Sequence, residues 1–220
     1  MLGLAALLAS PFAHTEDIDI FAGINATSDL PNVILILDNS ANWSTNLPVP
    51  DCFYNEGGVA SSVGPKGSNP NKEQGKKVAI QKCALYNVID TLPVKPDGSA
   101  LFNIAIMLLN ESPASNAGGY PRLAFTKLDT PNKAALKVVI KGLAIDADKG
   151  NNASFAKALY ESYLYYAAAA PYKGNAGTKW DSAAFDSGRY KSPATASCGR
   201  NFVILIANGS PESSENNPFR

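Results

Sequence analysis

The chain has 220 residues and a mass of 23.2 kDa, which suffices for one domain with a sizeable core and is too little for a multidomain enzyme. Its 19 basic and 19 acidic residues cancel to a formal net charge of zero, which argues against binding to the phosphate backbone of nucleic acids. The single histidine, His14, follows an apolar N-terminal stretch, so removal of that stretch would exclude imidazole catalysis and histidine-based zinc sites.

The N-terminus is typical of a secretory signal. Leu2 to Ala9 is an apolar run, small residues follow it, and an acidic segment begins at Glu16. The run is too short to span a bilayer, so we expect residues 1–15 to be a signal peptide and the chain to have no transmembrane span. No basic residue precedes the run, because the first one in the chain is Lys66. A buried N-terminal helix is the alternative interpretation.

The cysteine content favours export to an oxidising compartment, where one disulfide can form. A bridge between Cys52 and Cys83 would tie a long polar loop to the helix that follows it. Cys198 would then be a free buried thiol or would pair outside this chain. Three reduced, buried thiols are the alternative.

The first half of the chain begins with a strand and continues with a loop and a helix. Residues 32–37 (NVILIL) form a continuous apolar run, as in strands buried on both faces of a parallel sheet. Glycines and prolines predict a long loop over 38–72. Helical spacing of apolar residues then predicts a helix over 73–92, which Pro93 ends.

Two strands and a second helix come next. The runs 103–109 and 120–128 are separated by a short turn with glycine and proline, which predicts an antiparallel hairpin. Thr130 followed by Pro131 predicts a helix start, with the threonine hydroxyl as N-cap.

The last part of the chain contains a polar turn at 146–152 and a third helix over 154–170. A Gly/Ala/Ser-rich insertion occupies 172–198, and 201–207 (NFVILIA) is a second fully apolar strand. Loops of this length in a compact domain are usually functional.

This order of elements predicts an α/β fold: a doubly wound, mostly parallel sheet with an antiparallel edge hairpin. In such sheets the binding crevice lies outside the carboxyl ends of the parallel strands. Two loops emerge there, 38–42 and 208–210, and both carry small side chains with oxygen atoms. Hard cations such as Mg²⁺ and Ca²⁺ prefer oxygen ligands of this kind.

The segment NVILILDNSAN, from Asn32 to Asn42, resembles the first strand and metal-binding loop of a von Willebrand factor type A domain. More closely, several segments together resemble the N-terminal region of PilY-type type IV pilus tip proteins. Their order over Glu16 to Asn217 carries the resemblance: EDIDIFAG, DNSANWS, GKKVAIQKCALYNVIDTL, FNIAIMLLNE, AKALYESYLYY and CGRNFVILIANGSPESSEN.

The resemblance implies a non-enzymatic binding module that acts with minor pilins in pilus biogenesis, surface attachment and twitching motility. It also implies export to the periplasm, outer surface or pilus tip of a Gram-negative bacterium. The alternative is a general type A-domain adhesin that binds a host or matrix ligand and has no role in a pilus.

The resemblance also assigns a metal-ion-dependent adhesion site to Asp38, Ser40, Asn42 and Asn208, but the motif is degenerate. Asn42 replaces a serine of the family and Asn208 replaces an aspartate, so one of two carboxylates is lost. The family's threonine aligns with about Ala153, which has no ligand oxygen. Because oxygen sites gain affinity from ligand charge, we expect Mg²⁺ or Ca²⁺ to bind weakly or not at all. If no cation binds, we expect Asp38 to cap the crevice through backbone hydrogen bonds.

A complete type A domain has six strands, whereas this chain ends soon after the fourth predicted strand. We therefore expect 16–220 to be a partial type A-like domain, truncated after that strand and carrying the 172–198 insertion. The remainder of a full-length protein would be one of its partners. Alone, such a fragment would expose a sheet edge and apolar surface and would be poorly soluble.

Three aromatic residues of the insertion, Trp180, Phe185 and Tyr190, are candidates for contact with a ligand above the crevice. In the alternative interpretation they hold the insertion on its own domain, as irregularly spaced aromatics often do.

An enzyme is the competing class. Haloacid-dehalogenase-like phosphatases keep a nucleophilic aspartate after their first strand, where this chain has Asp38. Their chemistry requires a second aspartate two residues later, and Ser40 occupies that position. The chain also has no P-loop, G-x-S-x-G elbow or C-x-x-C motif, so we predict no enzymatic activity.

Overall fold

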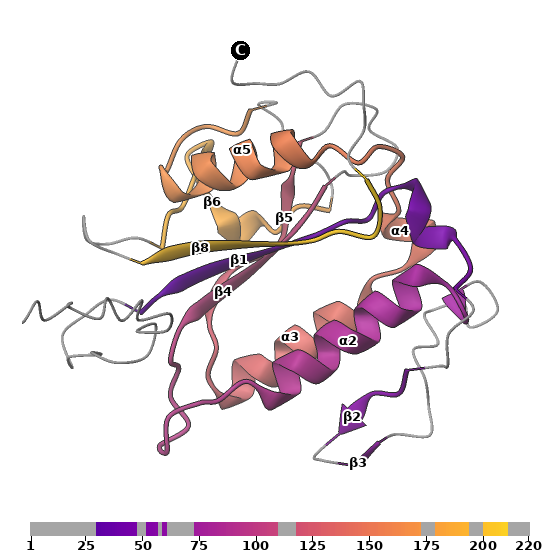
Figure 1. The fold of residues 1–220 in the computed structure, drawn as a ribbon. Coiled ribbons are helices and arrows are strands. Elements are labelled where there is room, and N and C mark those ends of the chain that lie inside the picture. Colours follow the sequence, from indigo (N-terminus) through magenta and orange to yellow (C-terminus); the bar gives the residue numbers. More distant parts are fainter. Residues whose placement is uncertain are drawn as a thin grey trace, which may run out of the picture.

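The computed structural model describes residues 30–47, 52–56, 59–60, 73–109, 118–172, 179–193 and 200–210. The predicted signal peptide at 1–15, Cys198 and most of the turn in the predicted hairpin lie outside these ranges. Figure 1 shows a layered α/β arrangement in which one main sheet lies between helices.

The main sheet has four strands in the order β5-β4-β1-β8. β1 pairs in parallel with both β4 and β8, and Asn32 lies opposite Asn103 and Asn201. β5 pairs with β4 in the antiparallel sense. The predicted α/β class, mostly parallel sheet and antiparallel edge strand are therefore confirmed. The strand bounds are β1 (Asn32–Leu37), β4 (Asn103–Leu108), β5 (Tyr120–Lys127) and β8 (Asn201–Ile206).

Helices cover both faces of the sheet. α2 (Lys77–Thr91) and α3 (Thr130–Gly142) lie on one face and α5 (Phe155–Tyr166) on the other (Figure 1). Alternate residues of β1 belong to two cores: Leu35 packs on the α2 and α3 side, and Ile34 packs on the α5 side. This double burial explains why the central strand is apolar without alternation.

Helix starts differ from the sequence-based expectation. The N-cap of α3 is Asp129, whose carboxylate accepts a hydrogen bond from the Asn132 N–H at 3.0 Å, so the prediction of Thr130 as N-cap is wrong. Thr130 is already the first helical residue, and its hydroxyl instead donates to the Gly98 carbonyl at 3.4 Å. α2 begins later than predicted, because Gly75 has a φ of +72° and interrupts the helical path.

Two further differences lie around α5. The helix ends at Tyr166, because Ala168 adopts a φ of +51° well before Pro171. The predicted polar turn at 146–152 contains the short helix α4 (Ile145–Asp148). Asp148 of this helix is buried and is not part of a solvated turn.

The described part of the insertion forms a small hairpin. The 3-10 helix η2 (Ser182–Ala184) leads into β6 (Phe185–Asp186), which pairs with β7 (Arg189–Tyr190). Ser187 and Gly188 form the tight turn, and both have positive φ angles, 50° and 77°. The loop after β1 contains the 3-10 helix η1 (Ala41–Ser44), and a second small hairpin joins β2 (Asn55–Glu56) to β3 (Val59–Ala60).

None of the helices in the described ranges has both the length and the apolar character needed to cross a bilayer.

Candidate binding site

The two loops expected to form the binding crevice meet where β1 and β8 end. The Asn208 N–H donates to Asp38 Oδ2 at 2.9 Å, and the Asn208 side-chain amide donates to the Asp38 carbonyl at 2.6 Å. The loop before α5 reaches the same place, because the Gly150 N–H donates to the Asn39 carbonyl at 2.7 Å. Parallel strands end at one edge of a sheet, so the fold brings together loops that lie far apart in the sequence.

Asp38 is fully buried, and both of its carboxylate oxygens accept backbone hydrogen bonds. Oδ1 accepts from the Ser40 N–H at 2.9 Å, and Oδ2 accepts from the Asn208 N–H at 2.9 Å. The first contact closes the turn after β1, and the second holds the end of β8 against it. This geometry supports the interpretation in which Asp38 caps the crevice.

Other atoms of the expected metal site are arranged differently. Ser40 Oγ and Asn208 Oδ1 are buried, and neither has a hydrogen-bond partner in the described part of the chain. Asn42 is exposed and touches the other loop: a Cβ added to Gly209 would lie 2.4 Å from the Asn42 amide nitrogen. The Lys77 ammonium donates to the Asn208 carbonyl and places a positive charge beside these loops.

The donor set therefore fits a hard cation poorly. Ser40 and Asn208 could each offer an oxygen, but the one carboxylate, Asp38, already accepts two N–H groups and an ammonium lies nearby. Nowhere in the described ranges do three His, Cys, Asp or Glu side chains form a group able to hold a metal ion. We keep the prediction that Mg²⁺ or Ca²⁺ binds weakly or not at all.

An Asn208→Asp variant tests this reading of the loop. Without metal we expect it to lose about 1–2 kcal/mol of stability, because it lacks the amide bond to Asp38 and sets two carboxylates together. Added Mg²⁺ should raise its melting temperature and leave the wild type unchanged. Asn208→Ala loses the same hydrogen bond without adding charge, so it should be destabilised but insensitive to Mg²⁺. A Mg²⁺-insensitive Asn208→Asp melt would show that the loop is no remnant of a cation site.

A buried polar network connects the loop after β1 to α4. Asn39 accepts from the Leu109 N–H at 2.9 Å, and its amide donates to the Asp148 carbonyl at 2.5 Å. The Asp148 carboxylate accepts from the Ala144 N–H at 2.9 Å and lies 3.3 Å from Arg122 Nε. These bonds join the ends of β1 and β4 to α4, which fixes the position of the Asp38 turn.

A buried ion pair joins Lys82 of α2 to Glu73, which precedes that helix, and both residues contact the segment that joins α3 to α4. Lys82 Nζ is 3.2 Å from Glu73 Oε2 and also donates to the Leu143 carbonyl. Glu73 Oε1 accepts from the Ile145 N–H at 3.0 Å. Burial lowers the pKa of Lys82, and the Glu73 charge opposes that shift. Sequence reasoning missed this pair, although Lys82 lies on the apolar stripe of its helix.

The aromatic residues of the insertion stack on one another and on α5. Ring centroids are 5.3 Å apart for Trp180 and Phe185, 4.9 Å for Phe185 and Tyr190, and 4.6 Å for Tyr190 and Tyr165. Tyr190 is only 2% exposed, so it has almost no surface to offer a ligand. The geometry supports the interpretation in which these residues hold the insertion on its own domain.

Glu161 of α5 is the polar anchor of this cluster, and sequence reasoning missed it. The Tyr190 hydroxyl donates to Glu161 Oε1 at 2.7 Å, and the Tyr172 N–H donates to the same oxygen at 3.1 Å. Burial raises the pKa of Glu161 to about 7, against the opposing effect of these two hydrogen bonds. The signal in the sequence is a glutamate three residues after the buried Ala158 and four before the buried Tyr165.

Glu161 should make stability depend on pH. Its folded pKa of about 7 exceeds the ordinary value of 4.5, so between these values the folded state holds a proton that the unfolded state has lost. The contribution of Glu161 to the free energy of unfolding is therefore fully present below about pH 4.5. It falls by up to about 3 kcal/mol as the pH rises from there through 7. Urea denaturation at pH 5 and pH 8 measures the loss. Glu161→Gln should abolish this part of the slope, whereas Asp146→Asn, at an exposed position of α4, should keep it.

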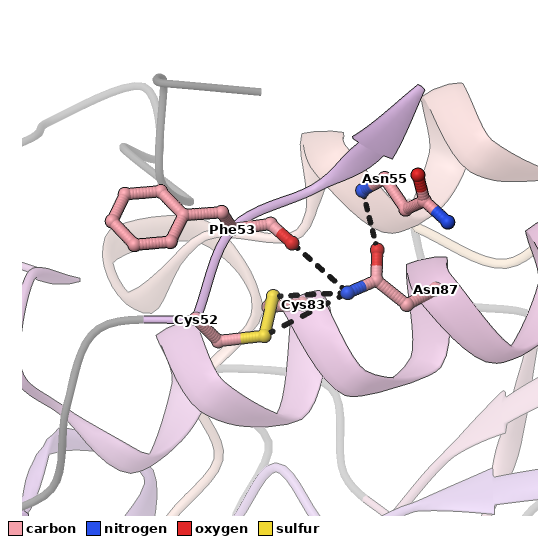
Figure 2. The surroundings of a disulfide bond; sticks show 5 residues. All are labelled: Cys52, Phe53, Asn55, Cys83 and Asn87. Carbon is pink, nitrogen blue, oxygen red and sulfur yellow. Dashed lines mark hydrogen bonds between the residues drawn. A yellow bond between two sulfur atoms is a disulfide. The ribbon is translucent and has the colours of Figure 1, made fainter. Parts of the chain in front are cut away.

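Figure 2 shows the disulfide between Cys52 and Cys83, whose Cα atoms are 5.9 Å apart. The predicted pairing is confirmed. Asn87, one turn after Cys83 on α2, reinforces it: its amide donates to the Phe53 carbonyl at 2.9 Å, and its Oδ1 accepts from the Asn55 N–H at 2.6 Å (Figure 2). The bridge and this side chain together hold 52–55 along α2.

Comparison with protein-family models, curated proteins and solved structures finds no match to this chain.

Proposed function

We propose that this chain is a non-enzymatic binding module of a type IV pilus tip protein, built on a von Willebrand factor type A-like domain. In this proposal it is exported to the periplasm, outer surface or pilus tip and acts in pilus biogenesis, attachment and twitching motility. The observation that carries the proposal is the meeting of the DNSAN loop after β1 with Asn208 after β8, joined through Asp38. The sequence resemblance places its motifs in these same two loops.

The mechanism would be protein–protein association at the crevice. Ala41 and Asn42 of η1 and Gly209 and Ser210 after β8 are exposed at the rim, so they offer contact surface. The Asp38 oxygens are both held by backbone N–H groups, which supports a structural role for this carboxylate over that of a nucleophile.

Binding to purified pilins tests the proposal. We expect the immobilised chain to bind minor pilins of the source bacterium with a micromolar dissociation constant. Asn42→Arg should abolish binding, because a bulky cation would replace a small amide at the crevice rim. Thr91→Arg is the matched control, since Thr91 is exposed at the far end of α2, away from these loops. Deletion of the gene should reduce surface pili and twitching.

Two other outcomes would contradict parts of the proposal. Binding to host matrix proteins but to no pilin would favour the general adhesin. Turnover of a generic phosphatase substrate with Mg²⁺ that is lost in Asp38→Asn would show an enzyme instead.

A further inference from the structure

The loop after β8 contains the only Asn-Gly pair in the sequence, Asn208 followed by Gly209. An asparagine in such a pair can lose its side-chain nitrogen spontaneously, because glycine has no side chain to hinder attack by its own backbone nitrogen. Gly209 is exposed, and the chain bends at both residues. Water and hydroxide therefore have access to the peptide bond that would react.

Lys77, the first residue of α2, contacts this same peptide bond. Its ammonium donates to the Asn208 carbonyl oxygen at 2.5 Å. The carbonyl of Asn208 and the N–H of Gly209 belong to one peptide bond, so loss of the Gly209 proton leaves a negative charge that is shared with the carbonyl oxygen. An ammonium on that oxygen stabilises the anion and raises the fraction of the nucleophilic form.

The side chain of Asn208 is held through its nitrogen and not through its oxygen. The amide nitrogen donates to the Asp38 carbonyl at 2.6 Å, whereas Oδ1 is buried and has no hydrogen-bond partner in the described part of the chain. Departure of the nitrogen would break the bond to Asp38, at a cost of about 1 kcal/mol. Attack on the side-chain carbonyl carbon, Cγ, disturbs no such bond at Oδ1.

The Asp38 carboxylate is the charge that opposes the reaction. It accepts from the Asn208 N–H at 2.9 Å, but that N–H belongs to the preceding peptide bond. It also accepts from the Ser40 N–H at 2.9 Å, so two N–H dipoles partly neutralise its charge. Because Lys77 contacts the reactive peptide bond directly, we expect its effect to be the larger one.

Packing of the two loops explains why residue 209 is a glycine. A Cβ added there would lie 2.4 Å from the amide nitrogen of Asn42, which is closer than a side chain allows. The contact between the loop after β1 and the loop after β8 therefore requires a residue without a side chain. That requirement also leaves the Gly209 nitrogen unhindered.

We propose that Asn208 is a self-modification site, which deamidates in the folded protein with the help of Lys77. The Gly209 nitrogen loses its proton to hydroxide and attacks Cγ of Asn208. The new N–C bond closes a succinimide ring, and the bond from Cγ to the amide nitrogen breaks, so that this nitrogen takes up a proton from water and leaves as ammonia. Water then opens the ring at either carbonyl and gives aspartate or isoaspartate. In total, one water is consumed and one ammonia is released.

The modification changes the charge of the loop. It adds a carboxylate beside Asp38 and removes the amide bond from Asn208 to the Asp38 carbonyl. As the protein ages, a partner would therefore meet two carboxylates at this edge of the sheet in place of one. The proposal goes beyond the proposed function and does not depend on it, because no pilin takes part in the reaction.

Incubation of the purified 220-residue chain at pH 8 tests the proposal. We expect the peptide that contains residue 208 to show the mass gain of an NH₂ replaced by OH, and to take up heavy oxygen from labelled water. Lys77→Met should slow this reaction about tenfold, because a neighbouring charge shifts such an ionisation by about one pKa unit or more. Lys76→Met is the matched control: it removes the same charge one residue earlier and should keep the wild-type rate.

The same measurement in denaturing urea separates the contact from the stability of the variants. Unfolding removes the contact between Lys77 and the Asn208 carbonyl, so wild type and Lys77→Met should deamidate at equal rates there. Three results would each overturn the proposal. They are wild-type deamidation at 208 that occurs only in urea, an equal native rate in wild type and Lys77→Met, and a difference between these two chains that persists in urea.

Discussion

Replacing Glu73 by glutamine is expected to lower the free energy of unfolding by about 3 kcal/mol, because it leaves the Lys82 ammonium buried without its counter-charge. Lys82 and Glu73 are both about 1% exposed, and Lys82 also donates to the Leu143 carbonyl. Urea denaturation at pH 7 measures the change. Because native domains are stable by only about 5–15 kcal/mol, a loss of this size is a large part of the total.

A double-mutant cycle separates the ion pair from mere packing. Combining Glu73→Gln with Lys82→Met removes both charges. The loss of unfolding free energy in the double variant should therefore be much smaller than the sum of the losses in the two single variants. Additive losses would show that the pair is not coupled.

The pH dependence gives an independent check on this pair. The Glu73 charge raises the pKa of Lys82, so Glu73→Gln should lower that pKa further below its ordinary value of 10.5. A cation with a depressed folded pKa holds fewer protons folded than unfolded, so stability rises with pH through this window. The deficit of Glu73→Gln should therefore shrink as the pH approaches 10.

Loss of the Cys52–Cys83 bridge is the second large effect that we expect. The two cysteines are 31 residues apart, and opening a loop of that length costs about 3–4 kcal/mol in the chain-entropy estimate. The Cys52→Ser/Cys83→Ser variant should unfold at correspondingly lower urea concentration. Reductant should destabilise the wild type by the same amount and leave this variant unchanged.

Cys198→Ser is the matched control for the bridge. We expect it to keep the stability of the wild type and its response to reductant, because the bridge joins the other two cysteines. If Cys198→Ser abolished the response to reductant, the assigned pairing would be wrong.

The main strands could be predicted from sequence because their signal is local. β1 and β8 are apolar runs that become parallel strands, although only β1 is buried and β8 is partly exposed, and a short turn between 109 and 120 predicted the antiparallel pair. Chain order also favoured the Cys52–Cys83 pairing, because this bridge would join the long polar loop to the helix that follows it in the chain. The ends of helices were predicted less well, because each depends on a single residue. The Asp129 carboxylate caps α3, and the positive φ angle of Ala168 ends α5.

The candidate site was predicted only in part. Chain order and parallel pairing sufficed to bring Asp38 and Asn208 to one edge of the sheet. Two further features depend on the tertiary structure. Lys77 donates to the Asn208 carbonyl because α2 packs against the loops, and both carboxylate oxygens of Asp38 accept hydrogen bonds from backbone N–H groups. The aromatic insertion shows the same limit: whether Tyr190 faces solvent or Glu161 is a question of packing.

By itself, the sequence determined the fold class and the order of the main strands and helices and favoured one cysteine pairing, because apolar periodicity and chain connectivity are encoded locally. Tertiary structure alone decided which charged groups are buried, as for Glu73, Lys82 and Glu161. Burial depends on neighbours far away in the chain: the insertion covers β5 through Asp181, whereas none of the described segments covers β8 in the same way. That difference cannot be read from the apolar pattern of either strand.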